Sequence, residues 1–117
     1  MVGIIKNNII RPFGFKDAFR CSDLELMEEI LKTEEINFDK YMYKACMSKN
    51  YPVAEFLFGK IHDNINARFY FFCAFRDLKL VKFCAGVSNI HKGLKIAKSY
   101  NFDDKIIYLE KIIKKNK

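Results

Sequence analysis

The stretch Asp77-Leu78-Lys79-Leu80-Val81-Lys82-Phe83-Cys84 decides the fold, because similar stretches occur three more times along the chain. It opens with Asp, a residue that favours the N-cap of a helix, and its apolar residues then recur at the i, i+3 and i+4 positions of one helix face. Each similar stretch also opens with Asp or Asn: residues 23–31, 50–58 and 104–109. The four starts lie roughly 27 residues apart, which is typical of stacked supersecondary repeats.

A second helix is expected before each of these stretches. The candidate segments are residues 12–21, 39–47, 66–75 and 93–100, and each contains an alanine that would let its partner helix approach closely: Ala18, Ala45, Ala74 and Ala97. A single helix pair cannot bury its apolar face alone, so neighbouring pairs are expected to stack. The sequence therefore predicts an all-α single domain over residues 1–117, a short solenoid of about four helix-turn-helix repeats with units at about 12–36, 37–64, 65–90 and 91–117.

Composition supports a packed helical domain. Among 117 residues only 5 are Gly and 2 are Pro, while 50% are apolar and 15% aromatic, which excludes a disordered chain. The aromatic run 69–75 is closed by Arg68 and Arg76, far short of the ~20 apolar residues of a membrane span. No secretory leader is recognisable at the start. We therefore expect no membrane partner and a cytoplasmic location, with the nucleus as an alternative.

Residues that could carry chemistry are scattered rather than clustered. The four cysteines are spread without a C-x-x-C pair, and the two histidines do not cluster with them. Buried, reduced thiols and exposed histidines explain this pattern best. The chain also lacks a phosphate loop, a nucleophile elbow and a metal motif. We therefore predict no catalytic residues, no metal, no cofactor and no enzymatic activity.

Charge is unevenly distributed. The net charge is +7, yet residues 23–39 are strongly acidic and the segment from Lys92 onward is rich in lysine. A uniformly basic nucleic-acid binder would not usually have this pattern, so nucleic acid is the less favoured partner. The alternative prediction, a nucleic-acid-associated protein, would use the lysine-rich C-terminal part: Lys111, Lys114, Lys115 and Lys117.

The aromatic run 69–75 has two interpretations. A helix that is apolar on every side is either central in an array or carries an exposed contact patch. Exposed aromatic side chains are common anchors at protein interfaces. Four aromatic residues are the candidate protein-binding anchors: Tyr41, Tyr43, Tyr70 and Phe71.

The order of residues in these units resembles the ankyrin repeat. In residues 74–83 an alanine precedes Asp-Leu-Lys-Leu-Val-Lys-Phe, which is similar to the second half of an ankyrin unit, and residues 97–109 follow the same order. The likeness covers roughly residues 12–113, although no unit carries a Thr-Pro-Leu-His opening. The order of residues is most similar to the shortened ankyrin-like repeats of large DNA viruses, such as asfarvirus multigene-family proteins. The resemblance implies protein binding without catalysis. A further hypothesis is that the partner is a host or cellular protein and that binding blocks a signalling or defence pathway.

Overall fold

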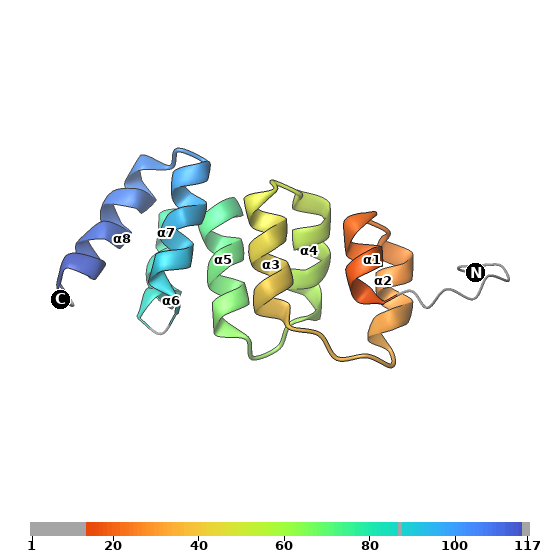
Figure 1. The fold of residues 1–117 in the computed structure, drawn as a ribbon. Helices are drawn as coiled ribbons and strands as arrows, with labels where there is room; N and C mark the ends of the chain where they lie inside the picture. Colours follow the sequence, from red (N-terminus) through yellow and green to blue (C-terminus); the bar gives the residue numbers. More distant parts are fainter. Residues whose placement is uncertain (1–13, 87, 116–117) are drawn as a thin grey trace, which may run out of the picture. The chain divides into compact units, whose positions relative to one another are not determined.

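The described part of the chain is entirely helical. The computed structural model describes residues 14–86 and 88–115, and within these residues it contains helices and no strand (Figure 1). This confirms the predicted all-α class. In chain order the helices are α1 (Phe15–Arg20), α2 (Leu24–Leu31), α3 (Phe38–Met47), α4 (Tyr51–Lys60), α5 (Ile65–Phe75), α6 (Leu78–Ala85), α7 (Ile90–Ser99) and α8 (Asp103–Lys115).

Contacts divide the chain into two units that meet in sequence between Asn37 and Phe38. The described part of the first unit is the pair α1 and α2, which pack against each other. The Asp23 side chain accepts a hydrogen bond from the Leu26 backbone N–H at 3.1 Å and caps α2. The Glu34 carboxylate accepts another from the Phe15 N–H at 3.3 Å, so the segment after α2 is tied back to the start of α1.

The second unit contains three helix pairs. Helices α3, α5 and α7 lie side by side as one layer, and each is followed by its partner, α4, α6 or α8 (Figure 1). Helix α4 also packs against α5, and α6 also packs against α8. Helix α5 therefore has neighbours on most of its sides.

The turns within three of the four pairs have the same geometry. The alanine carbonyls of Ala18, Ala45 and Ala97 each accept a hydrogen bond from the N–H five residues later, at 2.9–3.1 Å. The residue just before that N–H has a left-handed backbone in each turn: Ser22, Lys49 and Asn101, with φ of 54°, 58° and 59°. This is the Schellman pattern at a helix C-terminus. The α5–α6 turn is shorter, and its Arg76 is extended.

The aromatic run of α5 is core, which resolves the question that the sequence left open. Residues 69–74 are all buried and only Phe75 is partly exposed. The Phe71 ring stacks on Phe58 of α4 with centroids 4.3 Å apart, and the Phe75 ring meets Tyr100 edge-on at 5.9 Å. The run is apolar on every side because helices surround it.

A buried lysine closes the C-terminal end of α5. Lys105 is 4% exposed, and its Nζ donates hydrogen bonds to the backbone carbonyls of Cys73 at 3.0 Å and Phe72 at 3.4 Å. The ammonium also lies 4.1 Å from the centroid of the Phe102 ring. The last carbonyls of a helix lack partners within it, and the negative end of its dipole attracts a cation. Even so, burial lowers the pKa of Lys105 below its ordinary value.

Candidate functional site

Most of the predicted aromatic anchors are inside the molecule. Tyr70 is 1% exposed, Phe71 is 0% exposed and Tyr41 is also buried. A side chain with almost no accessible surface cannot contact a partner, so the structure does not fit Tyr70 and Phe71 as binding anchors, and Tyr41 offers only 9% of its surface. The physical reason for Tyr70 and Phe71 is that α5, the central helix, uses its aromatic rings to fill the space between the two layers, while Tyr41 is among the buried residues of α3.

Tyr43 is the exception among the four. It is only partly buried, its ring meets Tyr70 edge-on at 5.7 Å, and the Lys92 Nζ lies 5.1 Å from its centroid. Burial and the negative charge of Asp39 raise the pKa of Tyr70 to about 12, so this inner ring stays neutral at ordinary pH. Tyr43 and Lys92 remain a small mixed patch on α3 and α7.

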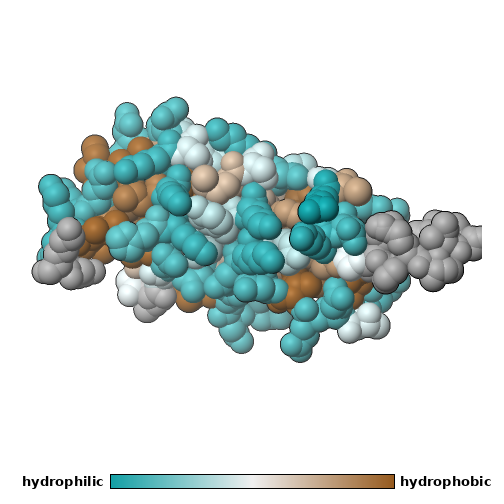
Figure 2. Space-filling view, viewed as in Figure 1, coloured by the Kyte–Doolittle hydropathy of each residue, from teal (hydrophilic) through white to brown (hydrophobic). Residues whose placement is uncertain are grey.

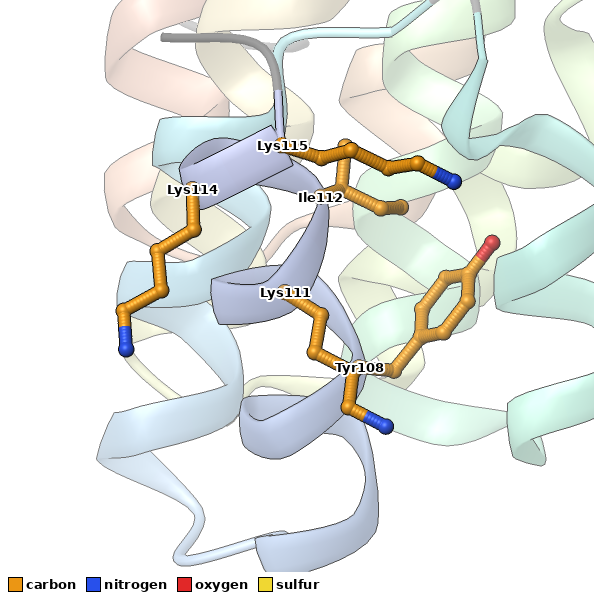
Figure 3. Close-up of a pocket in the computed structure, with 5 residues that line it drawn as sticks. All are labelled: Tyr108, Lys111, Ile112, Lys114 and Lys115. Carbon is orange, nitrogen blue, oxygen red and sulfur yellow. The ribbon is translucent and has the colours of Figure 1, made fainter.

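The predicted lysines, in contrast, gather around a groove. A groove of about 540 Å³ runs along the C-terminal half of α8 and is lined by Tyr108, Lys111, Ile112, Lys114 and Lys115. In Figure 3 the side chains of Tyr108, Ile112 and Lys115 project to the same side of the helix, while Lys114 points to the other. We call this feature the α8 groove. It contains three of the four predicted lysines, and the fourth, Lys117, lies outside the described residues.

Two large apolar side chains are exposed on the helices beside this groove. Phe83 of α6 is 81% exposed and Ile107 of α8 is 57% exposed. Figure 2 shows apolar surface over α8 with hydrophilic residues around it. Neither residue was singled out from the sequence, although a signal exists. At 100° per residue, Phe83 lies about 200° around α6 from the buried Val81, and Ile107 lies about 200° around α8 from the buried Lys105.

The electrostatics of the α8 groove are basic. Residues Lys111, Lys114 and Lys115 are exposed, and none of them forms an ion pair with a residue in the ranges 14–86 and 88–115. The Lys82 Nζ lies 5.3 Å from the centroid of the Tyr108 ring and adds a fourth cation from α6. The nearby carboxylate of Glu110 is engaged elsewhere, 3.6 Å from the Lys98 Nζ.

The described side chains form no catalytic constellation that we can recognise. No group of three or more His, Cys, Asp or Glu residues in this part of the chain could hold a metal ion. Burial raises the pKa of the Cys46 thiol and raises that of Cys73 to about 12, so both thiols stay protonated and unreactive at neutral pH. Cys84 is buried with its pKa raised as well, whereas Cys21 is exposed, against the expectation of burial.

Comparisons with known proteins add no family. No family model matches the chain, and neither a curated protein nor a solved structure matches it. Within the described ranges, every helix is too short or too polar to cross a bilayer. The α8 groove and the exposed Phe83 and Ile107 are the surface features of α6 and α8 that could contact another molecule.

Proposed function

We propose that this chain is a non-catalytic protein-binding module built as an ankyrin-like helical array. The observation that carries the proposal is the exposure of Phe83 and Ile107, at 81% and 57%, on helices that pack against each other. Leaving a large apolar side chain in water forgoes roughly 1.5–3 kcal/mol relative to covering it. Two such residues on neighbouring helices are of the kind that a protein partner covers.

The family resemblance supports the same class of function. Three successive helix pairs in the second unit present a continuous series of side-by-side helices, as stacked repeats do. In the viral ankyrin-like proteins that the sequence resembles, such surfaces serve protein binding. The partner of this chain would then be a host protein in a signalling or defence pathway.

The test is a paired substitution of the exposed apolar residues. Phe83→Asp with Ile107→Asp should abolish co-purification of a partner that tagged wild-type protein captures, as read by quantitative mass spectrometry. Met47→Asp, which also changes an exposed apolar residue but on α3, is the matched control and should keep the partner. Thermal melting within about 2 °C of wild type would show that the fold is intact. Equal capture by the double variant would refute this surface.

A second candidate function is supported by the lysines of the α8 groove. Lys111, Lys114 and Lys115 line the groove together with the Tyr108 ring, and cations beside an aromatic ring can bind a phosphate backbone and stack a base. Fluorescence anisotropy with single-stranded and duplex oligonucleotides would test it. Binding that weakens steeply as salt rises would support the nucleic-acid function, and no binding at low salt would remove it.

A further inference from the structure

We infer that the α8 groove binds an acidic amphipathic helix of the partner protein. This inference rests on the proposed protein-binding function and specifies the chemistry of the partner. Three features support this inference: the described lining comes from a single helix, the lysines of the groove are unpaired within the described residues, and one face of the Tyr108 ring is covered by the Lys82 ammonium.

The lining of the groove indicates a helical partner. Tyr108, Lys111, Ile112 and Lys115 occupy the i, i+3, i+4 and i+7 positions, which form one straight stripe along α8. The lining residues that the structure describes all come from this one helix (Figure 3), so no residue within 14–86 and 88–115 is found in an opposite wall. A second helix laid along such a stripe supplies that wall and packs its own i, i+3, i+4 and i+7 residues against it. A small molecule would have most of its surface left in water.

The charge of the groove indicates an acidic partner. Lys111, Lys114 and Lys115 present three ammonium groups that form no ion pair within the described residues, and Lys82 adds another from α6. Carboxylates at the edges of a partner helix would complement these cations, while its apolar stripe covers Tyr108 and Ile112. Complementary charges of this kind mainly increase association rate and selectivity.

The aromatic ring of the groove favours protein over nucleic acid. Base stacking needs an open ring face, and one face of Tyr108 is occupied by the Lys82 ammonium at 5.3 Å. Ile107 and Ile112 offer apolar surface, which a phosphate backbone does not cover.

The experiment measures binding of a defined probe to the full chain. The probe is a fluorescein-labelled peptide of about 16 residues with Leu at the i, i+3, i+4 and i+7 positions and Glu at the others. A matched peptide with Lys in place of Glu and a single-stranded oligonucleotide are compared with it. We expect only the Glu peptide to bind clearly, with affinity falling as salt rises from about 50 to about 300 mM.

Two chain variants locate the binding. Lys111→Glu with Lys115→Glu should weaken the Glu peptide about tenfold or more, and the milder pair Lys111→Gln with Lys115→Gln should weaken it less. Lys44→Glu, an exposed lysine on α3, makes the same change of charge outside the groove and should leave binding within about twofold. Circular dichroism of each variant reports whether α8 is still folded.

Each other outcome overturns the inference. Tighter binding of the oligonucleotide, lost in the same groove variants, would assign the groove to nucleic acid. Salt-sensitive self-association of the wild-type chain through this face, seen by sedimentation velocity, would make the occupant a second copy. Failure of the Glu peptide to bind removes the acidic-helix inference, while the Phe83 and Ile107 test decides separately whether the chain binds protein at all.

Discussion

Gly93 shows how a single residue sets the distance between two helices. It lies inside α7, and a Cβ at this position would overlap the Phe69 ring of α5, with the Cζ atom 2.6 Å away and the Cys73 Sγ at 3.1 Å. The absence of a side chain therefore lets α7 pack directly on the aromatic core of α5. A helical glycine usually costs about 1 kcal/mol relative to alanine, so a packing reason outweighs that cost here.

Gly93→Ala is expected to destabilise the protein by about 1–2 kcal/mol, because overpacking exceeds the gain in helix propensity. Gly59→Ala is the matched control: Gly59 also lies within a helix, and a Cβ there meets nothing within 4 Å. The control should stabilise the protein by about 0.5 kcal/mol. Urea unfolding of both variants measures the difference. A stabilising Gly93→Ala would contradict the close approach of α7 and α5.

Lys105 is the clearest case of a residue whose environment cannot be predicted from the sequence of its own helix. Its sequence neighbours form an ordinary amphipathic helix start, where lysine is expected in water, yet its ammonium bonds to carbonyls more than 30 residues earlier in the chain. The Cys73 carbonyl is available because the short α5–α6 turn lacks the Schellman bond found in the other turns, whereas the Phe72 carbonyl also accepts from the Arg76 N–H at 3.0 Å.

Substitutions at Lys105 should separate the contribution of its aliphatic stem to stability from the contribution of its ammonium group. Lys105→Ala removes the buried stem and the donors together, and is expected to cost about 3 kcal/mol of stability. Lys105→Met keeps most of the stem and leaves the Cys73 carbonyl without its side-chain donor, so it should cost only about 1 kcal/mol. Chemical denaturation measures both values. Equal losses would show that the hydrogen bonds, rather than the packed stem, account for the effect.

At the level of elements, the positions of all eight helices follow from local signals. Each segment expected to be a helix is one over its described residues, with ends shifted by a few residues, while residues 12 and 13 of the first segment lie outside the described part. Asp23, Asn50 and Asp77 are N-caps as expected, but Asp104 lies inside α8. Caps and apolar periodicity act within four or five residues, so the sequence displays them directly. Helix α8 is the main departure: its apolar pattern was followed only to residue 109, but the helix continues to Lys115.

The candidate site was less predictable than the helices, because exposure depends on which neighbours are present. The aromatic residues of α5 are buried by α3, α4, α6 and α7, whereas Phe83 and Ile107 lie on helix faces that no helix of the second unit covers. Sequence alone gives the number of apolar residues on a helix but not the number of helices around it. The lysines of α8 could be found from sequence, since charge clustering at one end of a helix is local.

The connector within three of the four pairs also depends on a backbone conformation that few residues accept. Asn101 has φ of 59° in the turn between α7 and α8, where a β-branched side chain would clash with the backbone. Asn101→Val is expected to cost about 1–2 kcal/mol, while Asn101→Gly should change stability by no more than about 0.5 kcal/mol. Thermal unfolding of the two variants gives the comparison. Equal melting temperatures would mean that this turn relaxes into another conformation.

At the level of the whole molecule, the two units differ in charge. Residues 14–37 include seven carboxylates and three basic side chains, while the second unit carries a large excess of lysine and arginine. The net charge of +7 thus conceals an acidic unit and a more strongly basic one. A negatively charged partner would be attracted to the basic unit rather than to the acidic one, which agrees with a docking surface at α8.

The buried ionisable groups of the second unit make its stability depend on alkaline pH. Burial raises the pKa of the Cys46 and Cys73 thiols, and it raises the pKa of Tyr70 and Tyr100 to about 12. A group whose pKa is higher in the folded state loses its proton first in the unfolded chain, so stability falls as pH rises above the unfolded pKa. For thiols that decline begins near pH 8.5, and for the tyrosines near pH 10.

Lys105 opposes this decline, because its pKa is lowered in the folded state. The folded protein then releases the lysine proton before the unfolded chain does, and this group alone adds stability with rising pH up to about 10.4. We expect the free energy of unfolding, measured under reducing conditions, to fall between pH 8.5 and 10 by at most about 1.4 kcal/mol per pH unit for each buried thiol. The Lys105→Met variant should lose stability more steeply over the same range, because the opposing group is gone. A wild-type stability that stays flat to pH 10, or a variant with the same slope as wild type, would show that these groups are not buried as the structure places them.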